Sequence, residues 1–159
     1  MNCKNLFTGV VVLLLLTAFS FTSSAQDCKQ YQALIDKLDQ AMSEKNADLL
    51  AEVYHDNAVR HTQEGDEAGI AKIKEKAAGF YANVPDAAGK NIDVICAGDR
   101  VVVRWLGSGT PKGSPKKIEV TGISIYKVEK GKIVEEWEEM NSLSLMMQMG
   151  YELKAPATN

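Results

Sequence analysis

The segment KKIEVTGISIYKVEKGKIVEEWEEM, residues 116–140, decides the fold of this chain. Two runs within it, 116–129 and 132–140, alternate apolar and polar residues, and a KGK turn lies between them. Alternation with a period of two is typical of a strand with one buried face, so the segment predicts a hairpin. The same alternation upstream predicts three more strands, NAVRHTQ at 57–63, NIDVICAG at 91–98 and RVVVRWLGSG at 100–109.

Helical spacing dominates the part of the chain before these hairpins. Apolar residues three and four apart predict helices over 29–44, 47–55 and 65–84, the last ending before Pro85. Asn141 or Ser142 can cap a final helix that ends near Gly150. Helices followed by consecutive hairpins predict an α+β fold. We expect a cone-shaped, curved antiparallel sheet, with three N-terminal helices packed against it and a short C-terminal helix.

The N-terminus has the order of a secretory signal peptide. Lys4 precedes an apolar run over 6–21, and small residues follow up to Ala25. A retained membrane anchor is the alternative, which Thr8, Thr17 and the small residues before the cleavage point disfavour. We therefore expect export to the periplasm or the extracellular space, with no stable membrane anchor after cleavage. The expected organisation is a signal peptide over 1–25, one domain over 26–152 and a flexible tail over 153–159.

Composition excludes several classes of function. The chain has 159 residues, a formal net charge of −3 and no cluster of basic residues, so we exclude nucleic-acid binding. Only His55 and His61 are present as histidines, without CxxC or HExxH, which disfavours a metal site. The glycine-rich stretch 107–113 joins two strands and lacks the helix N-terminus that would bind a phosphate. We expect no cofactor and no serine or cysteine nucleophile.

Two cysteines remain after the signal peptide, Cys28 and Cys96. In an oxidising compartment they can form a disulfide, which would stabilise the fold by about 4 kcal/mol on the chain-entropy model. Alternatively, Cys96 is a buried free thiol, since Ile95 and Ala97 flank it on a predicted strand. The sequence leaves both open.

Candidate site residues come from the polar groups on the predicted strands. A strict period of two puts Ile133, Glu135, Trp137, Glu139 and Asn141 on one face, a mixture that is typical of a pocket. Glu136 and Glu138 then fall on the solvated surface. A carboxylate among aromatic rings favours proton transfer, whereas an Arg104–Glu135 ion pair would make Glu135 structural. The candidates are His61, Glu135 and Asn141 as catalytic residues, and Arg104, Trp105, Tyr126 and Trp137 as ligand-binding residues, with only one of Arg104 and Trp105 facing the cone.

The runs GDRVVVRWLGSGT, VTGISIYKVEKGKIVEEW and LMMQMG resemble the SnoaL-like polyketide cyclase and ester cyclase family. VRH at 59–61 and the Phe80…Pro85-Asp86 pair fit the same pattern, so the resemblance spans roughly residues 30–150. It implies the cone-shaped fold of the nuclear-transport-factor-2-like superfamily, a pocket for a small lipophilic molecule and a homodimer through the open sheet face. In characterised cyclases of this family an aspartate moves a proton during an intramolecular aldol closure.

The family aspartate falls on Asn141 when the chain is aligned on Gln148 to Gly150. An amide donates and accepts hydrogen bonds but does not shuttle a proton near neutral pH. Pro111 also replaces a histidine that family members often carry after Gly109-Thr110, whereas His61 matches the family histidine after the first strand. Three hypotheses follow: a metal-independent enzyme, with His61 or Glu135 as acid/base; a non-catalytic small-molecule-binding domain; and a cone filled by its own tryptophan and methionine side chains.

Overall fold

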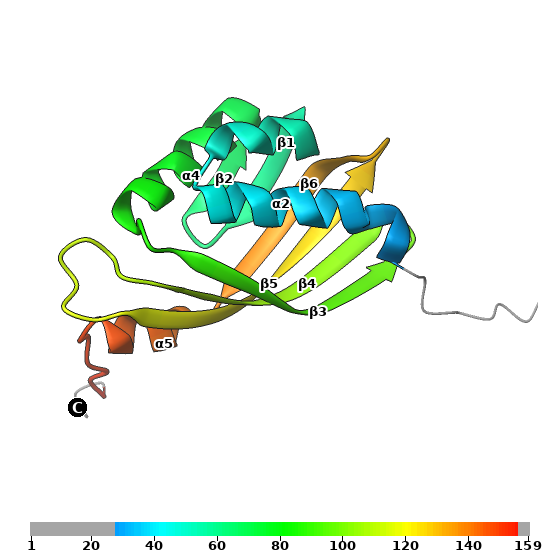
Figure 1. Ribbon diagram of the computed structural model, residues 1–159. Coiled ribbons are helices and arrows are strands. Elements are labelled where there is room, and N and C mark those ends of the chain that lie inside the picture. Colours follow the sequence, from blue (N-terminus) through cyan, green and yellow to red (C-terminus); the bar gives the residue numbers. More distant parts are fainter. Residues whose placement is uncertain (1–27, 156–159) are drawn as a thin grey trace, which may run out of the picture.

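The computed structural model describes residues 28–155 (Figure 1). The expected signal peptide therefore lies outside the described residues, as do residues 156–159. Within the described part no helix is long and apolar enough to cross a membrane. In chain order the elements are η1 (Cys28–Tyr31), α2 (Gln32–Glu44), η2 (Ala47–Leu49), α3 (Leu50–Val53), β1 (Tyr54–Thr62), β2 (Gly65–Ala68), α4 (Ile70–Asn83), β3 (Ala88–Ala97), β4 (Arg100–Gly109), β5 (Ile118–Glu129), β6 (Lys132–Met140) and α5 (Ser142–Gln148).

The six strands form one curved sheet in the order β2-β1-β6-β5-β4-β3. The predicted α+β class and the β3–β6 hairpins are confirmed. The prediction of a wholly antiparallel sheet is wrong for one pair, because β1 and β6 run parallel. These two strands lie far apart in the sequence, so no turn between them indicated their relative direction.

The hairpin of β5 and β6 turns at Lys130 and Gly131. Glu129 pairs with Lys132, which leaves a two-residue loop, and φ is 51° at Lys130 and 79° at Gly131. Positive φ at both central residues is the geometry of a type I′ turn, whose twist matches that of the flanking strands. This turn explains why the segment 116–140 forms the hairpin that its alternation predicts.

The third predicted helix begins later than its apolar spacing indicated. Gly65 and Gly69 have φ of 112° and 82°, in the left-handed region, and the four residues from Gly65 to Ala68 form β2. The helix α4 starts only at Ile70. The second predicted helix ends two residues earlier than expected, at Val53, and β1 begins at Tyr54.

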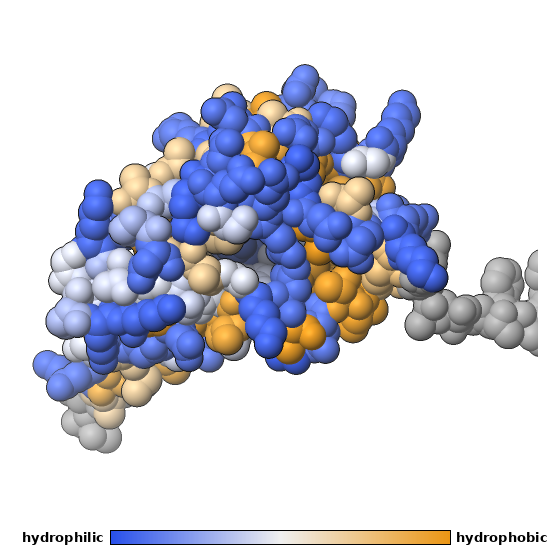
Figure 2. Space-filling view, in the orientation of Figure 1, coloured by the Kyte–Doolittle hydropathy of each residue, from blue (hydrophilic) through white to orange (hydrophobic). Residues whose placement is uncertain are grey.

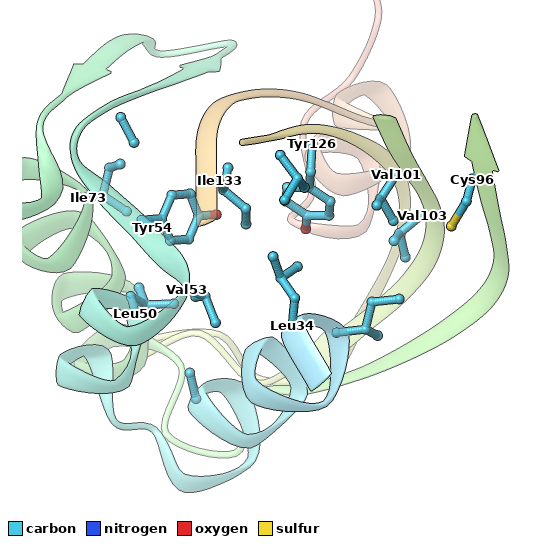
Figure 3. Close-up of a cluster of buried hydrophobic side chains, with 14 residues drawn as sticks. Leu34, Leu50, Val53, Tyr54, Ile73, Cys96, Val101, Val103, Tyr126 and Ile133 are labelled. Carbon is cyan, nitrogen blue, oxygen red and sulfur yellow. The ribbon is translucent and has the colours of Figure 1, made fainter. Parts of the chain in front are cut away.

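The helices α2 and α4 cover the concave face of the sheet, and α5 lies on the opposite side (Figure 1). Leu34 of α2 points towards Tyr126 and Ile133 of the sheet (Figure 3). The buried core that joins the two layers consists of Leu34, Ile35, Ala41, Leu50, Val53, Tyr54, Ala58, Ile73, Cys96, Val101, Val103, Tyr126, Val128 and Ile133. Part of the concave face is thus filled by apolar side chains, and its polar residues gather further along the strands.

A disulfide joins Cys28 of η1 to Cys96 of β3, with the Cα atoms 5.5 Å apart. The structure therefore has the first of the two states that the sequence left open. Nearby, the Tyr31 hydroxyl donates a hydrogen bond of 2.6 Å to the carbonyl of Gly98. Both contacts fasten the start of the described chain to the β3 edge of the sheet.

Candidate functional site

A row of polar side chains crosses the concave face of the sheet. Arg60 of β1 lies opposite Glu67 of β2 on one side and Glu136 of β6 on the other. Glu136 in turn pairs with Tyr126 of β5, which continues the row towards Val101. Charged and phenolic groups on the inner face of a small sheet are unusual, because burial of a charge is costly without partners.

The guanidinium of Arg60 contacts three carboxylates, one through each nitrogen. Nη1 is 3.3 Å from Glu67 Oε2, and Nη2 donates a hydrogen bond of 2.8 Å to Glu138 Oε2. Nε lies 3.3 Å from Glu136 Oε2, close enough for an ion pair although it lacks hydrogen-bond geometry. A planar guanidinium suits this arrangement, because its N–H groups form a rigid fork.

Glu136 is the most deeply buried acid of this cluster, with 2% of the residue exposed. The Tyr54 hydroxyl donates a hydrogen bond of 2.5 Å to Glu136 Oε2. Burial raises the pKa of Glu136, although Arg60 and hydrogen bonds from Tyr54 and Ser124 favour its ionised form. Burial likewise raises the pKa of Tyr54 well above its ordinary value, and the Glu136 charge adds to that rise.

Trp105 forms an apolar floor beside this cluster. Its Nε1–H donates a hydrogen bond of 3.1 Å to Ser124 Oγ, which fixes the indole. The ring lies against Gly107 and Gly122, where a Cβ atom would meet it. Burial raises the pKa of the neighbouring Tyr126 hydroxyl, so that side chain stays neutral as a polar group. Of the pair Arg104 and Trp105, Trp105 is the one on the concave face.

Glu138 is the acid of the cluster that solvent reaches. It lies opposite Ser124 on the concave face, and 16% of its side chain is exposed, against 7% for Glu67 and 2% for Glu136. Figure 2 shows the surface hollowed between the helical layer and the sheet. Its partial exposure makes Glu138 the acid of this cluster that a molecule from solvent can reach most easily.

A β-bulge overturns the predicted face of β6. Lys127 pairs with Glu135 but Val128 pairs with Ile133, so Val134 is an extra residue. After the bulge Glu136 and Glu138 face inwards, whereas Glu135 and Trp137 face outwards. The predicted common face of Ile133, Glu135 and Trp137 is therefore wrong, as is the assignment of Glu136 and Glu138 to the solvated surface.

His61 and Glu135 meet on the convex face instead. His61 Nδ1 is 2.8 Å from Asp66 Oδ1, and Nε2 is 3.3 Å from Glu135 Oε1. The imidazole stacks on Trp137 with a centroid distance of 5.5 Å, and the Arg100 guanidinium lies 5.0 Å from the Trp137 ring. Hydrogen bonding to Asp66 raises the pKa of His61, partial burial opposes this, and the bond to Glu135 raises it further. The sheet thus separates His61 and Glu135 from the cluster around Arg60.

Arg104 also lies on the convex face, where it pairs with Asp93. Its Nε donates a hydrogen bond of 2.7 Å to Asp93 Oδ2, and Nη2 is 2.5 Å from the same oxygen. The alternative of an Arg104–Glu135 ion pair is therefore wrong. Both partners are about half exposed, which is typical of a surface pair of small energetic weight.

Asn141 is the N-cap of α5. Its side-chain oxygen accepts a hydrogen bond of 3.0 Å from the Ser144 amide, and it lines a surface pocket of about 430 Å³. The other residues of this pocket are Lys116, Leu143, Ser144, Met147 and Gln148. The residues predicted as catalytic are therefore divided between the convex face and this pocket.

The side chains that the filled-cone hypothesis named are divided, because Trp105 lies on the concave face whereas Trp137 and the C-terminal methionines lie elsewhere. Trp137 is on the convex face, and Met146, Met147 and Met149, in α5 or directly after it, are each about half exposed. Within residues 28–155 no group of three or more histidine, cysteine or acidic residues has the geometry to hold a metal ion.

Sequence reasoning missed Arg60, Glu67, Glu136 and Glu138. A signal was present in the composition of the strands, because Arg60 is the only arginine before residue 100. A buried strand arginine requires acidic partners, and the EEWEE run is an obvious source. The bulge at Val134, which directs two of these glutamates inwards, has no mark in the sequence.

The comparisons with known proteins identify the family and the fold. A family model described as SnoaL-like polyketide cyclase matches residues 32–149. No curated protein matches the chain. TsrD from Streptomyces laurentii is 25% identical, with a TM-score of 0.72, over 79% of this chain and 98% of that one. A candidate polyketide cyclase from Bacillus cereus is 27% identical, with a TM-score of 0.67, over 76% and 80%.

A third solved structure shares the fold alone. It is a Catenulispora acidiphila protein with a ketosteroid isomerase-like fold, in complex with trimethylamine. It is 17% identical, with a TM-score of 0.70, over 76% of this chain and 95% of that one. The predicted cone-shaped fold is therefore confirmed by both the architecture and its relatives.

Proposed function

This chain belongs to the SnoaL-like polyketide cyclase family, and from that premise we propose that it binds a small lipophilic carbonyl compound and moves a proton on it, with Glu138 as the acid/base. The observation that carries the proposal is the position of Glu138. Of the three acids that contact Arg60 it has the most exposed side chain, at 16%, and it pairs across the strands with Ser124, whose hydroxyl accepts the hydrogen bond of Trp105.

The proposed chemistry needs one proton-transfer group and an apolar surface. The Glu138 carboxylate takes a proton from a carbon next to the substrate carbonyl, which leaves an enolate. In a ring closure the enolate attacks a second carbonyl of the same molecule, and the resulting alkoxide takes the proton back from Glu138. Trp105 provides the apolar contact for the substrate. The residue ends in its starting state, so the step requires no further reactant.

Deuterium exchange tests this proposal without knowledge of the natural substrate. The probe is 2-tetralone, a cyclic ketone fused to a benzene ring, and its α-proton exchange in D₂O is followed by NMR. We expect the mature protein to exceed the buffer rate, and Glu138→Gln to lose about 10²-fold or more of that gain. The matched control is Glu139→Gln, an exposed neighbour on the same strand. An exchange rate that Glu138→Gln leaves unchanged would overturn the role of Glu138.

The pocket at Asn141 favours a second candidate function, binding without catalysis. An amide cap beside apolar Leu143 and Met147 can hold a small lipophilic molecule but cannot shuttle a proton. Native mass spectrometry of the mature protein with lipophilic lactones and aromatic polyketides tests this. A bound mass that is lost on Met147→Lys, with no exchange activity in the wild type, would favour binding alone.

Export is a further part of the proposal. The Cys28–Cys96 disulfide supports it, because disulfides persist in oxidising compartments. We expect the full-length chain to be processed after Ala25 in a host that secretes it, which N-terminal sequencing of the product measures. A full-length product in the cytoplasm would argue against export.

Self-association through the convex face is the last part of the proposal. Ile95, Val102, Ile125 and Trp137 lie on neighbouring strands in one register, and they form an apolar row across that face. Apolar rows of this kind are typical of protein interfaces. We expect a dimer mass in light scattering and a monomer for Ile125→Lys. A monomeric wild type at high concentration would exclude this interface.

A further inference from the structure

Each nitrogen of the Arg60 guanidinium contacts a different acidic side chain. Nη1 contacts Glu67 on β2, Nε contacts Glu136 on β6, and Nη2 contacts Glu138 on β6. The shortest of the three contacts, 2.8 Å, is the one to Glu138. One guanidinium therefore balances three carboxylates, and a change at any of the three alters the charge that the other two experience.

Two of the three contacts are fixed independently of Glu138. Glu136 is buried and also accepts the hydrogen bond from Tyr54. Glu67 is 5% exposed, and it is the only buried residue of the short strand β2, which lies between Gly65 and Gly69. Glu67 and Glu136 thus flank two sides of the guanidinium, and Nη2 donates its hydrogen bond to Glu138.

The contact between Arg60 and Glu138 is made by one carboxylate oxygen. Nη2 donates to Oε2, in a single hydrogen bond rather than a two-oxygen fork. A carboxylate held in this way has a fixed orientation while its second oxygen can face a substrate. General acid–base catalysis requires this kind of fixed geometry between the proton-transfer group and the reacting atom.

We propose that Arg60 is a positioning residue for Glu138, and that Glu67 and Glu136 control how strongly Arg60 holds it. The proposal rests on the proposed function, since it assigns a purpose to the orientation of Glu138. Glu67, Glu136 and Glu138 share the positive charge of one guanidinium. A negative charge on Glu67 or Glu136 therefore weakens the attraction between Arg60 and the ionised carboxylate of Glu138. The titratable and charged groups around this contact are Glu67 of β2, Tyr54 of β1, Glu136 of β6, Tyr126 of β5 and Tyr81 of α4, together with the Glu64–Lys76 pair at its edge.

Direct titration of Glu138 tests the proposal on the resting mature protein. The side-chain carboxyl carbon of ¹³C-labelled Glu138 is followed by NMR against pH. We expect the carboxyl signal in Arg60→Gln to titrate at higher pH than in the wild type, because the cationic partner 2.8 Å away is lost. We expect the signal in Glu67→Gln to titrate at lower pH, because a competing carboxylate is lost. The control Glu75→Gln removes an exposed acid paired with Lys72 on α4, and should leave the titration unchanged.

Opposite shifts from the two substitutions separate positioning from a merely structural role. Loss of structure would move both variants in the same direction or abolish the signal. If Arg60→Gln does not fold, the same titration is measured on Glu67→Gln and Arg60→Lys. Arg60→Lys keeps the charge but loses the fork, so we expect a smaller upward shift of the Glu138 titration. An unchanged titration in Glu67→Gln would overturn the proposal.

The pH profile of tetralone exchange then connects the titration to activity. We expect the acidic limb of the profile to follow the Glu138 titration in each variant, upwards for Arg60→Gln and downwards for Glu67→Gln. Shifted titrations without any exchange in the wild type would refute the proposed function while the control of Glu138 by Arg60 stands. Exchange with an acidic limb that ignores the titration would refute the positioning role.

Discussion

The side-chain amide of Gln148 pairs with both backbone groups of Glu119. Gln148 Oε1 accepts a hydrogen bond of 3.0 Å from the Glu119 amide, and Nε2 donates one of 2.7 Å to the Glu119 carbonyl. β6 pairs with β5 only from Gly122 onwards, so this part of β5 has no strand on that side. Gln148 takes the place of a strand there and fastens α5 to the sheet.

Replacement of Gln148 by leucine should release α5. The two hydrogen bonds to Glu119 are lost, as are two weaker ones to Ser144, so we expect a loss of about 1–2 kcal/mol in the free energy of unfolding. We also expect faster hydrogen exchange at the Glu119 amide. Gln40→Leu is the control, because Gln40 bonds only to Glu44 within α2. Unchanged exchange at Glu119 would contradict the strand-like role of Gln148.

Gly122 should tolerate no side chain. A Cβ atom there would lie 2.6 Å from the Glu139 carbonyl oxygen and would also meet the ring of Trp105. We expect Gly122→Ala to destabilise the fold by about 1–3 kcal/mol and to change the tryptophan fluorescence. Gly79→Ala in α4 is the control, since nothing lies within 4 Å of its added Cβ, and it should stabilise by about 0.5–1 kcal/mol. Equal effects of the two substitutions would show that the indole moves freely.

The disulfide should contribute a large part of the stability. It links residues 68 apart in the sequence, so the chain-entropy model gives about 4 kcal/mol. We expect the double variant Cys28→Ser/Cys96→Ser to unfold at a lower urea concentration than the oxidised protein. The reduced wild type should match that variant. A midpoint that does not change with reductant would argue that the disulfide is not formed in solution.

Most of the fold could be predicted from the sequence, because its strands are long and regular in period. RVVVRWLGSG predicted β4 over residues 100–109, and KIVEEWEEM predicted β6 over 132–140, with the observed bounds. Trp105 and Tyr126 were placed among the inward candidates, and both lie on the concave face. These successes depend on local alternation, which every residue of a regular strand repeats.

The candidate site could not be predicted, because one irregular residue decides it. Counting by two from Ile133 reaches Glu135, whereas the bulge at Val134 makes Glu136 the next inward residue. A one-residue slip exchanges the two faces of a strand, so the convex and concave glutamates were interchanged. The parallel pairing of β1 with β6, which brings Arg60 to Glu136, is also a long-range contact without a local signal.

Glu136 should make the stability of the protein fall as pH rises. Burial raises its folded pKa above the ordinary value of 4.5, so the folded state holds a proton that the unfolded state has already released. Stability therefore falls as pH rises from about 4.5 through the folded pKa. We expect Glu136→Gln to lose this slope, which urea unfolding of both proteins across that range measures. A parallel pH dependence of the two proteins would contradict burial as the dominant cause.

His61, on the other face of the sheet, should give a pH dependence of the same sign. Its pKa is raised chiefly by the hydrogen bond from its Nδ1–H to Asp66, so we expect Asp66→Asn to lower it towards about 6.5 in an NMR titration of the imidazole. A raised histidine pKa stabilises the fold below the unfolded value, and this contribution is lost as pH rises through the folded value. Added salt should reduce the effect, since the Asp66 side chain is mostly exposed.

The control for His61 is Glu64→Gln, which removes a nearby carboxylate that pairs with Lys76. We expect it to leave the His61 titration unchanged. If Asp66→Asn fails to lower the pKa, then Glu135, through Nε2, dominates instead, and Glu135→Gln should produce the shift. Because His61 lies beside the apolar row of Ile125 and Trp137, the same titration measured in the Ile125→Lys variant also indicates whether that row is covered in solution.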